Sequence, residues 1–131
     1  MTTNILILAA ILMAEAEGES LKGKRIVADT MWNRASRRTP SALVRIATAK
    51  DQYAVPTKVQ MKRWQGRGMT APERKAWRDC QALAGMMIKG TYKPTTTATH
   101  FYNPRTAARK RWMSKLKARG QVGNHRYGRL E

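Results

Sequence analysis

The chain has 131 residues, of which 42% are hydrophobic, so it can bury one hydrophobic core and is not disordered by composition. We expect residues 1–131 to form a single domain. The 26 Lys and Arg residues against 8 Asp and Glu residues give a formal net charge of +18, which predicts an anionic partner such as nucleic acid, acidic lipid or a polyanionic envelope. The only cysteine, Cys80, excludes an internal disulfide and a cysteine-based metal cluster.

The first predicted helix runs from about Asn4, as N-cap, to Ala16. Residues 5–14 are apolar on all sides, which predicts burial. This run resembles the apolar part of a signal peptide, but the residues before it contain no Lys or Arg. Its ten residues are too few to cross a bilayer. We therefore predict a core helix, with no signal peptide and no membrane span.

Glu15 follows this apolar run and lies on the same helical stripe as Leu8 and Ile11. Burial disfavours the charged form of a carboxyl group and raises its pKa. A carboxylic acid that stays protonated near neutral pH can donate a proton to a leaving group, as in glycoside hydrolysis. Glu15 is thus our candidate general acid. The alternative is an exposed or ion-paired residue at the fraying end of the helix.

Two further helices are predicted before residue 50. Ser20 can cap a helix to about Ala35, and Pro40 can begin a short one that ends near Ala49. In the first of these, Asp29 lies four residues after Arg25, which favours an ion pair on the helix surface. The basic residues expected to remain in solvent on that helix are Lys22, Lys24, Arg25 and Arg34.

Residues 51–68 show no clear period and are predicted to be a loop. The loop carries Gln52, Tyr53, Trp64 and Gln65, which suit sugar recognition by stacking and hydrogen bonding. A capping box at residues 70–73 then opens a helix that ends at Gly90. Cys80 falls on the apolar stripe of this helix, so we predict an inert core thiol.

The last part of the chain is predicted as a strand at 95–102, a helix at about 106–118 and a returning strand at 121–129. We expect the helix to turn Ala108, Trp112, Met113 and Leu116 inward. Its other faces are basic. These basic residues could contact the phosphates of a nucleic acid, but no nucleic-acid-binding motif accompanies them. We therefore favour a solvated basic face that attracts polyanions such as an anionic cell envelope. The basic residues are Arg105, Arg109, Lys110, Arg111, Lys115, Lys117 and Arg119.

Other chemistries lack their signatures. The two histidines, His100 and His125, are far apart in sequence and form no i, i+4 pair, so we expect no metal site. There is no recognisable Ser-His-Asp or Cys-His setting and no phosphate-binding loop, and we expect no cofactor.

Four segments, in order, resemble the SleB-type cell wall hydrolases, which include spore-cortex lytic enzymes and phage endolysins. Residues 14–20, AEAEGES, resemble the E-A-R-G-E segment of that family, and residues 23–34, GKRIVADTMWNR, resemble its G-x-x-x-V-A-x-x-x-x-N-R helix. Gln52-Tyr53 resembles a Q-F pair. The C-terminal part resembles the ending of the family. Residues 98–103 resemble its A-T-H-Y-x-N motif, Trp112 resembles the W that follows, and residues 122–127 resemble its I-G-N-H-x-F/Y motif. Glu17 departs from the family, which tends to have Arg there.

The resemblance implies a lysozyme-like, mostly helical α+β domain with a small antiparallel β-sheet. It implies a peptidoglycan lytic transglycosylase that cleaves the MurNAc–GlcNAc β-1,4 bond, with Glu15 as the catalytic residue and a 1,6-anhydro product. Expected groove residues are Gln52, Tyr53, Tyr102, Asn103 and His125. For Asn33 and His100 we favour packed, hydrogen-bonded structural roles.

Two alternatives stay open at this point. A water-using muramidase would need a second carboxylate, for which Glu19 and Asp51 are the candidates. A small basic nucleic-acid-binding protein would bind without cutting walls. With the phage relatives in view, we expect a monomer that is made in a host cytoplasm and acts on the peptidoglycan layer after release.

Overall fold

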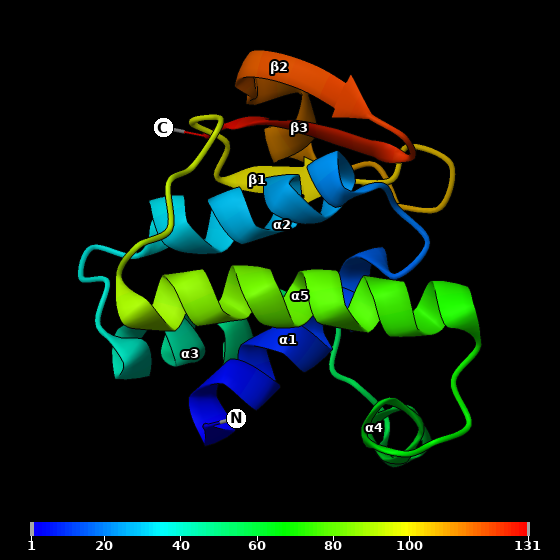
Figure 1. The fold of residues 1–131 in the computed structure, drawn as a ribbon. Helices are drawn as coiled ribbons and strands as arrows, with labels where there is room; N and C mark the ends of the chain where they lie inside the picture. Colours follow the sequence, from blue (N-terminus) through cyan, green and yellow to red (C-terminus); the bar gives the residue numbers. More distant parts are fainter. Residues whose placement is uncertain (1, 131) are drawn as a thin grey trace.

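The computed structural model describes residues 2–130, which form helices packed beneath one small β-sheet (Figure 1). The predicted α+β class, mostly helical with a small antiparallel sheet, is confirmed. The helices are α1 (Thr3–Ala16), α2 (Leu21–Arg34), α3 (Pro40–Thr48), α4 (Lys58–Gln65) and α5 (Ala71–Lys89). The remaining elements are β1 (His100–Tyr102), the 3-10 helix η1 (Arg111–Lys115), β2 (Lys117–Val122) and β3 (His125–Arg129).

Helix α1 is the centre of the core. It packs against α2, α3 and α5, which explains why its sequence is apolar on all sides. Leu8, Leu12 and Met13 are fully buried. The helix begins earlier than predicted, because Thr2 and not Asn4 is the N-cap: the Thr2 hydroxyl accepts a hydrogen bond from the N–H of Ile5.

Helix α5 lies along α1, and it begins and ends where its sequence predicts. Thr70 and Glu73 form the predicted capping box, and Gly90 ends the helix with a φ of 77°, which favours glycine. Cys80 is fully buried, and burial raises the pKa of its thiol to about 12. The prediction of an inert core thiol is confirmed.

The prediction of a loop over residues 51–68 is wrong in part, because α4 lies within it. Thr57 and Gln60 form a second capping box at the start of this helix. Trp64 is buried and stacks on Trp77 of α5, with ring centroids 6.0 Å apart. A local cap and one aromatic anchor therefore stabilise a helix too short to show a hydrophobic period.

Two charged residues of α2 were predicted to be exposed and are instead buried. Asp29 makes no surface ion pair; its carboxylate accepts hydrogen bonds from the Tyr92 hydroxyl and from Thr95 and Thr96. Lys24 donates from Nζ to the backbone carbonyls of Glu17 and Glu19, just after α1 ends. Both side chains are buried because each finds polar partners in another segment.

The C-terminal half departs most from the prediction. The expected helix at 106–118 is wrong: only Arg111–Lys115 is helical, as a 3-10 turn, and β2 begins at Lys117. Leu116 is buried as predicted, whereas Ala108 is exposed. The three strands are antiparallel in the order β1-β3-β2, so the β2–β3 hairpin completes the sheet that β1 begins.

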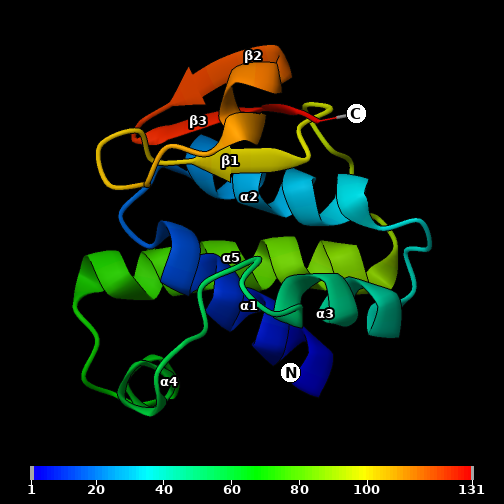
Figure 2. The same cartoon turned by 180° about the vertical axis from the view of Figure 1, so that it is seen from behind.

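The sheet lies over α2, and β1 packs against that helix. Figure 2 shows that the loop after β1, the connection from α1 to α2 and the segment between α3 and α4 all reach the same side of the molecule. The end of α1 therefore meets three irregular segments on that side. None of the helices within residues 2–130 is long and apolar enough to cross a membrane.

Candidate active site

Glu15 is in the last turn of α1 and its carboxylate is only partly exposed. Oε1 accepts a hydrogen bond from the N–H of Ala54, in the segment between α3 and α4. Burial raises the pKa of Glu15 above its usual range, and the Ala54 N–H acts in the opposite direction. The pKa shift is in the direction expected for a carboxyl group that follows a buried apolar run.

A cavity of about 790 Å³ opens beside Glu15. Its walls come from the end of α2, from residues 51–52 and from the stretch between β1 and η1. The loop between β1 and η1 thus faces the end of α1, and the cavity between them has polar walls. The lining residues are Glu15, Arg34, Asp51, Gln52, His100, Phe101, Tyr102, Asn103, Thr106, Ala107, Ala108, Lys110, Trp112, Met113 and His125.

A second cavity of about 310 Å³ continues from the first toward α4, where Gln60 lines it. Glu15, Asn103 and His125 line both cavities, so the two adjoin at Glu15. We call the combined hollow the groove. Glu15 therefore lies where the two cavities of the groove meet.

The structure brings four of the five predicted binding residues to the larger cavity: Gln52, Tyr102, Asn103 and His125. Gln52 is exposed, and its Oε1 accepts a hydrogen bond of 3.1 Å from Arg34 Nη1. Tyr102 meets Trp112 edge-on, with ring centroids 5.8 Å apart. Asn103 caps the turn after β1, since its Oδ1 accepts from the N–H of Arg105 at 2.9 Å.

His125 is buried at the start of β3, with 6% of its surface exposed. Its ring lies 5.0 Å from that of Phe101, and Nδ1 is 3.8 Å from Oε1 of Glu19. Within residues 2–130, Nδ1 has no hydrogen-bond partner. Burial lowers the pKa of His125, and Glu19 partly opposes this. Glu19 is itself held in place by the N–H of Asn124 in the β2–β3 turn.

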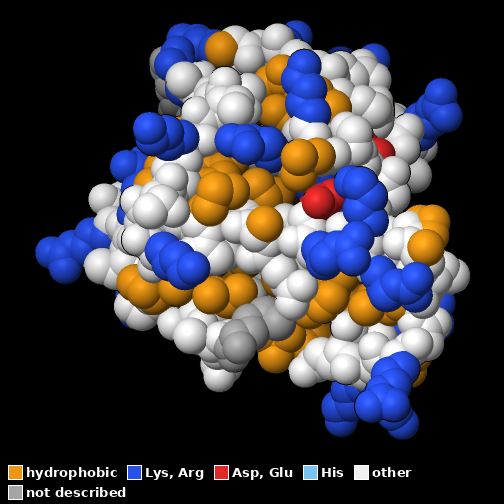
Figure 3. All heavy atoms as spheres, viewed as in Figure 1, with side chains coloured by type: hydrophobic (Ala, Val, Ile, Leu, Met, Phe, Trp, Pro, Cys, Tyr) orange, Lys and Arg blue, Asp and Glu red, His pale blue; other side chains and the backbone are white. Residues whose placement is uncertain are grey.

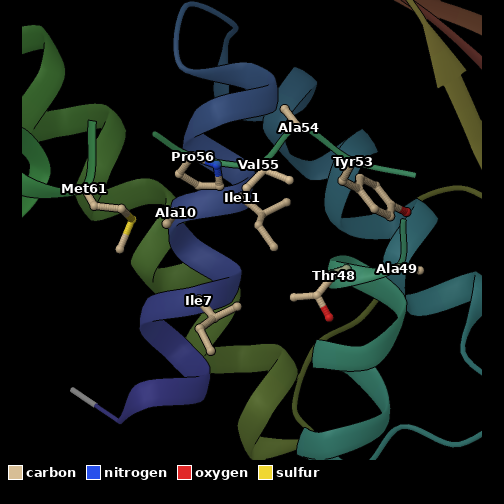
Figure 4. A pocket seen from close by; sticks show the side chains of 11 residues that line it. Ile7, Ala10, Ile11, Thr48, Ala49, Tyr53, Ala54, Val55, Pro56 and Met61 are labelled. Carbon is tan, nitrogen blue, oxygen red and sulfur yellow. The ribbon is translucent and has the colours of Figure 1, made fainter. Parts of the chain in front are cut away.

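Tyr53 is not among the residues that line the groove, which corrects its predicted place there. Its hydroxyl is buried and forms a hydrogen bond of 2.8 Å with Oγ1 of Thr30. Its ring lines a separate apolar cavity of about 330 Å³, where Figure 4 shows it near Ala54, Val55 and Ile11. A buried tyrosine needs a partner for its hydroxyl, and α2 supplies one. Tyr53 thus anchors the segment from which Ala54 reaches Glu15.

Sequence reasoning missed that Arg34 and Trp112 line the groove. Arg34 was expected in solvent, but its Nε donates to the carbonyl of Thr99, which places the guanidinium beside the start of β1. Trp112 was assigned to the inner face of a helix, and it lies instead against the rings of His100 and Tyr102. The signal for Trp112 was its place in the C-terminal motif, which the helical spacing obscured.

Asn33 and His100 have the structural contacts that were predicted. Asn33 Nδ2 donates to the carbonyls of Thr96 and Ala98, which fixes the segment that leads into β1. His100 Nδ1 lies 2.9 Å from the Thr99 hydroxyl. Burial, helped by the charge of Arg34, lowers the pKa of His100 to about 4, so this ring is neutral at physiological pH.

Among residues 2–130, no three His, Cys, Asp or Glu side chains are grouped so that they could hold a metal ion. The groove places the carboxyl group of Glu15 beside polar and aromatic side chains.

The fold is similar to two solved catalytic domains. One is the germination-specific lytic transglycosylase SleB from Bacillus anthracis, with a TM-score of 0.64, 20% identity and coverage of 98% of this chain and 97% of that chain. The other is SleB from Bacillus cereus, with a TM-score of 0.63, 20% identity and coverage of 96% and 89%. A search of curated proteins finds no match.

The profile of a family described as cell wall hydrolase matches residues 18–128. The match spans α2 through β3 and includes Gln52, Tyr102, Asn103 and His125; Glu15 lies three residues before it. With a fold shared over nearly the whole chain and a profile that covers most of it, this chain is an enzyme of the cell wall hydrolase family.

Proposed function

We propose that this enzyme is a peptidoglycan lytic transglycosylase that cleaves the MurNAc–GlcNAc β-1,4 bond and leaves a 1,6-anhydro end. The observation that carries the proposal is the position of Glu15, a partly buried carboxyl group with a raised pKa where the two cavities of the groove adjoin. The similarity in fold to two SleB catalytic domains, one of which is described as a lytic transglycosylase, supports the same reaction class.

One carboxyl group serves both halves of this reaction. Protonated Glu15 gives its proton to the glycosidic oxygen as the bond from that oxygen to C1 of MurNAc breaks. The resulting carboxylate then accepts the proton of the MurNAc 6-hydroxyl, whose oxygen bonds to C1 and closes the anhydro ring. No water is consumed, and Glu15 ends in its starting protonation state. Acid–base assistance of this kind contributes on the order of 10²–10⁴-fold.

The groove supplies groups suited to holding a glycan strand beside Glu15. Tyr102 and Trp112 offer ring faces and edges against which sugar rings can stack. Gln52 and Asn103 offer amide groups for sugar hydroxyls. His125 lines the groove at the junction, where its position is fixed by Phe101 and by the turn that Glu19 holds.

A water-using muramidase is the second candidate, because the larger cavity contains another carboxylate. Asp51 is exposed and lines that cavity with Glu15, so it could activate a water molecule across the groove. Glu19 is less suited to this role, because its carboxylate accepts a hydrogen bond of 2.9 Å from the Asn124 N–H and lies beside His125.

Mass spectrometry of purified peptidoglycan after digestion separates the two reactions. A transglycosylase leaves 1,6-anhydro MurNAc ends, which lack one water relative to the reducing ends that a hydrolase leaves. Asp51→Asn sharpens the test, since it should retain activity if no second carboxylate is required. Reducing ends, together with inactivity of Asp51→Asn, would establish the muramidase instead.

We further propose an endolysin-like role, in which the basic surface brings the enzyme to an anionic cell envelope. Figure 3 shows Lys and Arg side chains spread over α5 and the sheet, with few acidic side chains between them. This excess of basic over acidic side chains agrees with the formal net charge of +18. The attraction is electrostatic, so retention on purified walls should weaken as salt rises, and retention that does not change with salt would exclude it.

A further inference from the structure

A cavity of about 370 Å³ lies next to the groove and contains three arginines. Tyr102, Ala107 and Met113 line both this cavity and the larger cavity beside Glu15, so the two adjoin. The arginines are Arg109, Arg119 and Arg126. The remaining wall residues are Pro104 and Ser114. No carboxylate of residues 2–130 lines this cavity, and none of the carboxylates there forms an ion pair with these arginines.

Arg119 is fixed in place by a β-bulge in the sheet. The register of β2 against β3 shifts between Lys117 and Gly120, and Ala118 has a φ of 51°, in the left-handed region. A bulge turns side chains away from the regular alternation of a strand. Arg119 Nε then donates to the carbonyl of Leu116 at 2.6 Å, and Nη2 donates to that of Ser114. The guanidinium is thus held before any ligand arrives.

The other two arginines come from different segments. Arg126 lies on β3, where Nε donates to Oε1 of Gln121 at 3.3 Å, and Arg109 lies in the loop before η1. Three guanidinium groups that line one cavity repel each other unless an anion is bound. Guanidinium forks match the planar geometry of carboxylates and the oxygens of phosphates.

We propose that this cavity binds a carboxylate of the peptide stem on the muramyl sugar, so that the enzyme prefers glycan that still bears its peptides. The inference rests on the proposed action on peptidoglycan. A stem peptide projects from the glycan backbone and carries free carboxylates, so a strand in the groove would direct them into an adjoining cavity. Phosphate of an anionic wall polymer or of a nucleic acid backbone could satisfy the same arginines, and both are outcomes of the first test below.

The first test is binding, which needs no turnover. The arginine Nε–H signals of the full chain are followed by NMR as a synthetic stem peptide with free carboxylates is added. The Arg109 and Arg126 signals, assigned through their loss in Arg109→Gln and Arg126→Gln, should shift. Absence of any shift would overturn the inference. So would shifts produced by inorganic phosphate or a short DNA duplex but not by the peptide.

The second test is substrate preference. kcat/KM is measured on intact peptidoglycan and on peptidoglycan stripped of its stems by an amidase, and the ratio of the two is compared between variants. Arg109→Gln/Arg126→Gln should lower the ratio about tenfold, since charge-assisted hydrogen bonds are lost. The matched control is Arg67→Gln/Arg78→Gln, which removes the same charge from two exposed sites outside the groove and the arginine cavity. An equal fall in the control would show general attraction to the wall and overturn the inference.

The two tests separate this inference from the proposed function. A chain that binds the peptide but leaves glycan intact would refute the lytic activity and keep the anion site. A chain that cuts intact and stripped glycan equally well, in every variant, would keep the lytic activity and refute the site. We exclude Arg119 from the variants because its guanidinium also donates to the backbone carbonyls of Leu116 and Ser114, so its substitution would remove these structural contacts as well.

Discussion

Glu15 and Asp29 are both carboxylates on helices of the core, and the structure treats them in opposite ways. Asp29 is fully buried and receives hydrogen bonds from five donors: the Tyr92 hydroxyl and the N–H and hydroxyl groups of Thr95 and Thr96. Glu15 faces a cavity and receives one from the Ala54 N–H, the donor found for it within residues 2–130. The hydrogen-bonding capacity of the Asp29 carboxylate is satisfied, whereas the Glu15 carboxyl group is partly removed from water and has one donor to replace it.

This difference in hydrogen bonding distinguishes a carboxylate that stabilises the fold from one that is suited to acid–base chemistry. A carboxylate surrounded by donors fixes the segments that supply them, and here Asp29 fixes the stretch that leads from α5 to β1. Glu15 has little such compensation, and burial raises its pKa, which favours the protonated form. The two residues differ both in burial, which is complete for Asp29 and partial for Glu15, and in the number of hydrogen-bond donors around the carboxyl group.

The largest effect is expected on activity. Glu15→Gln keeps the shape of the side chain and an oxygen for the Ala54 N–H, but it cannot exchange a proton, so lysis of purified walls should fall on the order of 10²–10⁴-fold. The rate at which a suspension of purified walls loses turbidity measures this activity. The matched control is Asp79→Asn, which removes one charge from a surface pair with Lys75 and should stay within about twofold of the parent, since exposed pairs contribute little. Comparable loss in both variants would contradict a special role for Glu15.

The next effect is on stability. Asp29→Ala leaves several buried donors without an acceptor, so the free energy of unfolding should fall by about 3 kcal/mol or more. Asp29→Asn retains one acceptor oxygen and should lose less. Urea denaturation measures both. If Asp29→Ala were as stable as the parent, the donors around Asp29 would not hold this part of the fold.

Glu15→Gln should act in the opposite direction on stability. Because the folded-state pKa of Glu15 is raised, its ionisation opposes folding: stability is present below the unfolded pKa and declines as pH rises through the folded value. Glutamine does not titrate, so this variant should be modestly more stable than the parent at neutral pH. A variant that is less stable at pH 7 would place Glu15 with Asp29 among the structural carboxylates.

The smallest expected effect comes from the histidines. Burial lowers the pKa of His100 to about 4 and also lowers that of His125, so their contribution to stability is present above pH 6.5 and lost as pH falls toward 4. His100→Gln should weaken this acid dependence in thermal melts between pH 7 and pH 4. Identical pH profiles for the two proteins would show that His100 does not contribute.

Much of the helical fold could be predicted because its signals are local. The capping box at Thr70 and the stop at Gly90 gave α5, and the apolar run gave α1. For α4 the capping box at Thr57 was equally local but was overlooked, because residues 51–68 show no clear hydrophobic period. The predicted helix at 106–118 failed because tertiary contacts override its spacing: Trp112 packs against the rings of His100 and Tyr102, and Lys117 already pairs with Arg129 of β3.

The groove was predicted less completely than the fold. Four of the five predicted binding residues line it, and they lie in segments that resemble family motifs. Tyr53 does not line the groove, because its hydroxyl is hydrogen-bonded to Thr30 inside the protein. This contact joins segments that are distant in sequence, so it is visible only in the tertiary structure. Asp29 was misassigned for a related reason: its donors lie more than 60 residues away, and no local pattern pairs them with it.

A titration of the Glu15 carboxyl carbon by NMR, in the full chain without substrate, tests the central claim most directly. The Glu15→Gln spectrum assigns the signal. Our account predicts a midpoint above the ordinary glutamate value of 4.5, so that the protonated acid is available for transfer. A midpoint at or below that value would show a group held ionised by its surroundings, and Glu15 could not then be the proton donor.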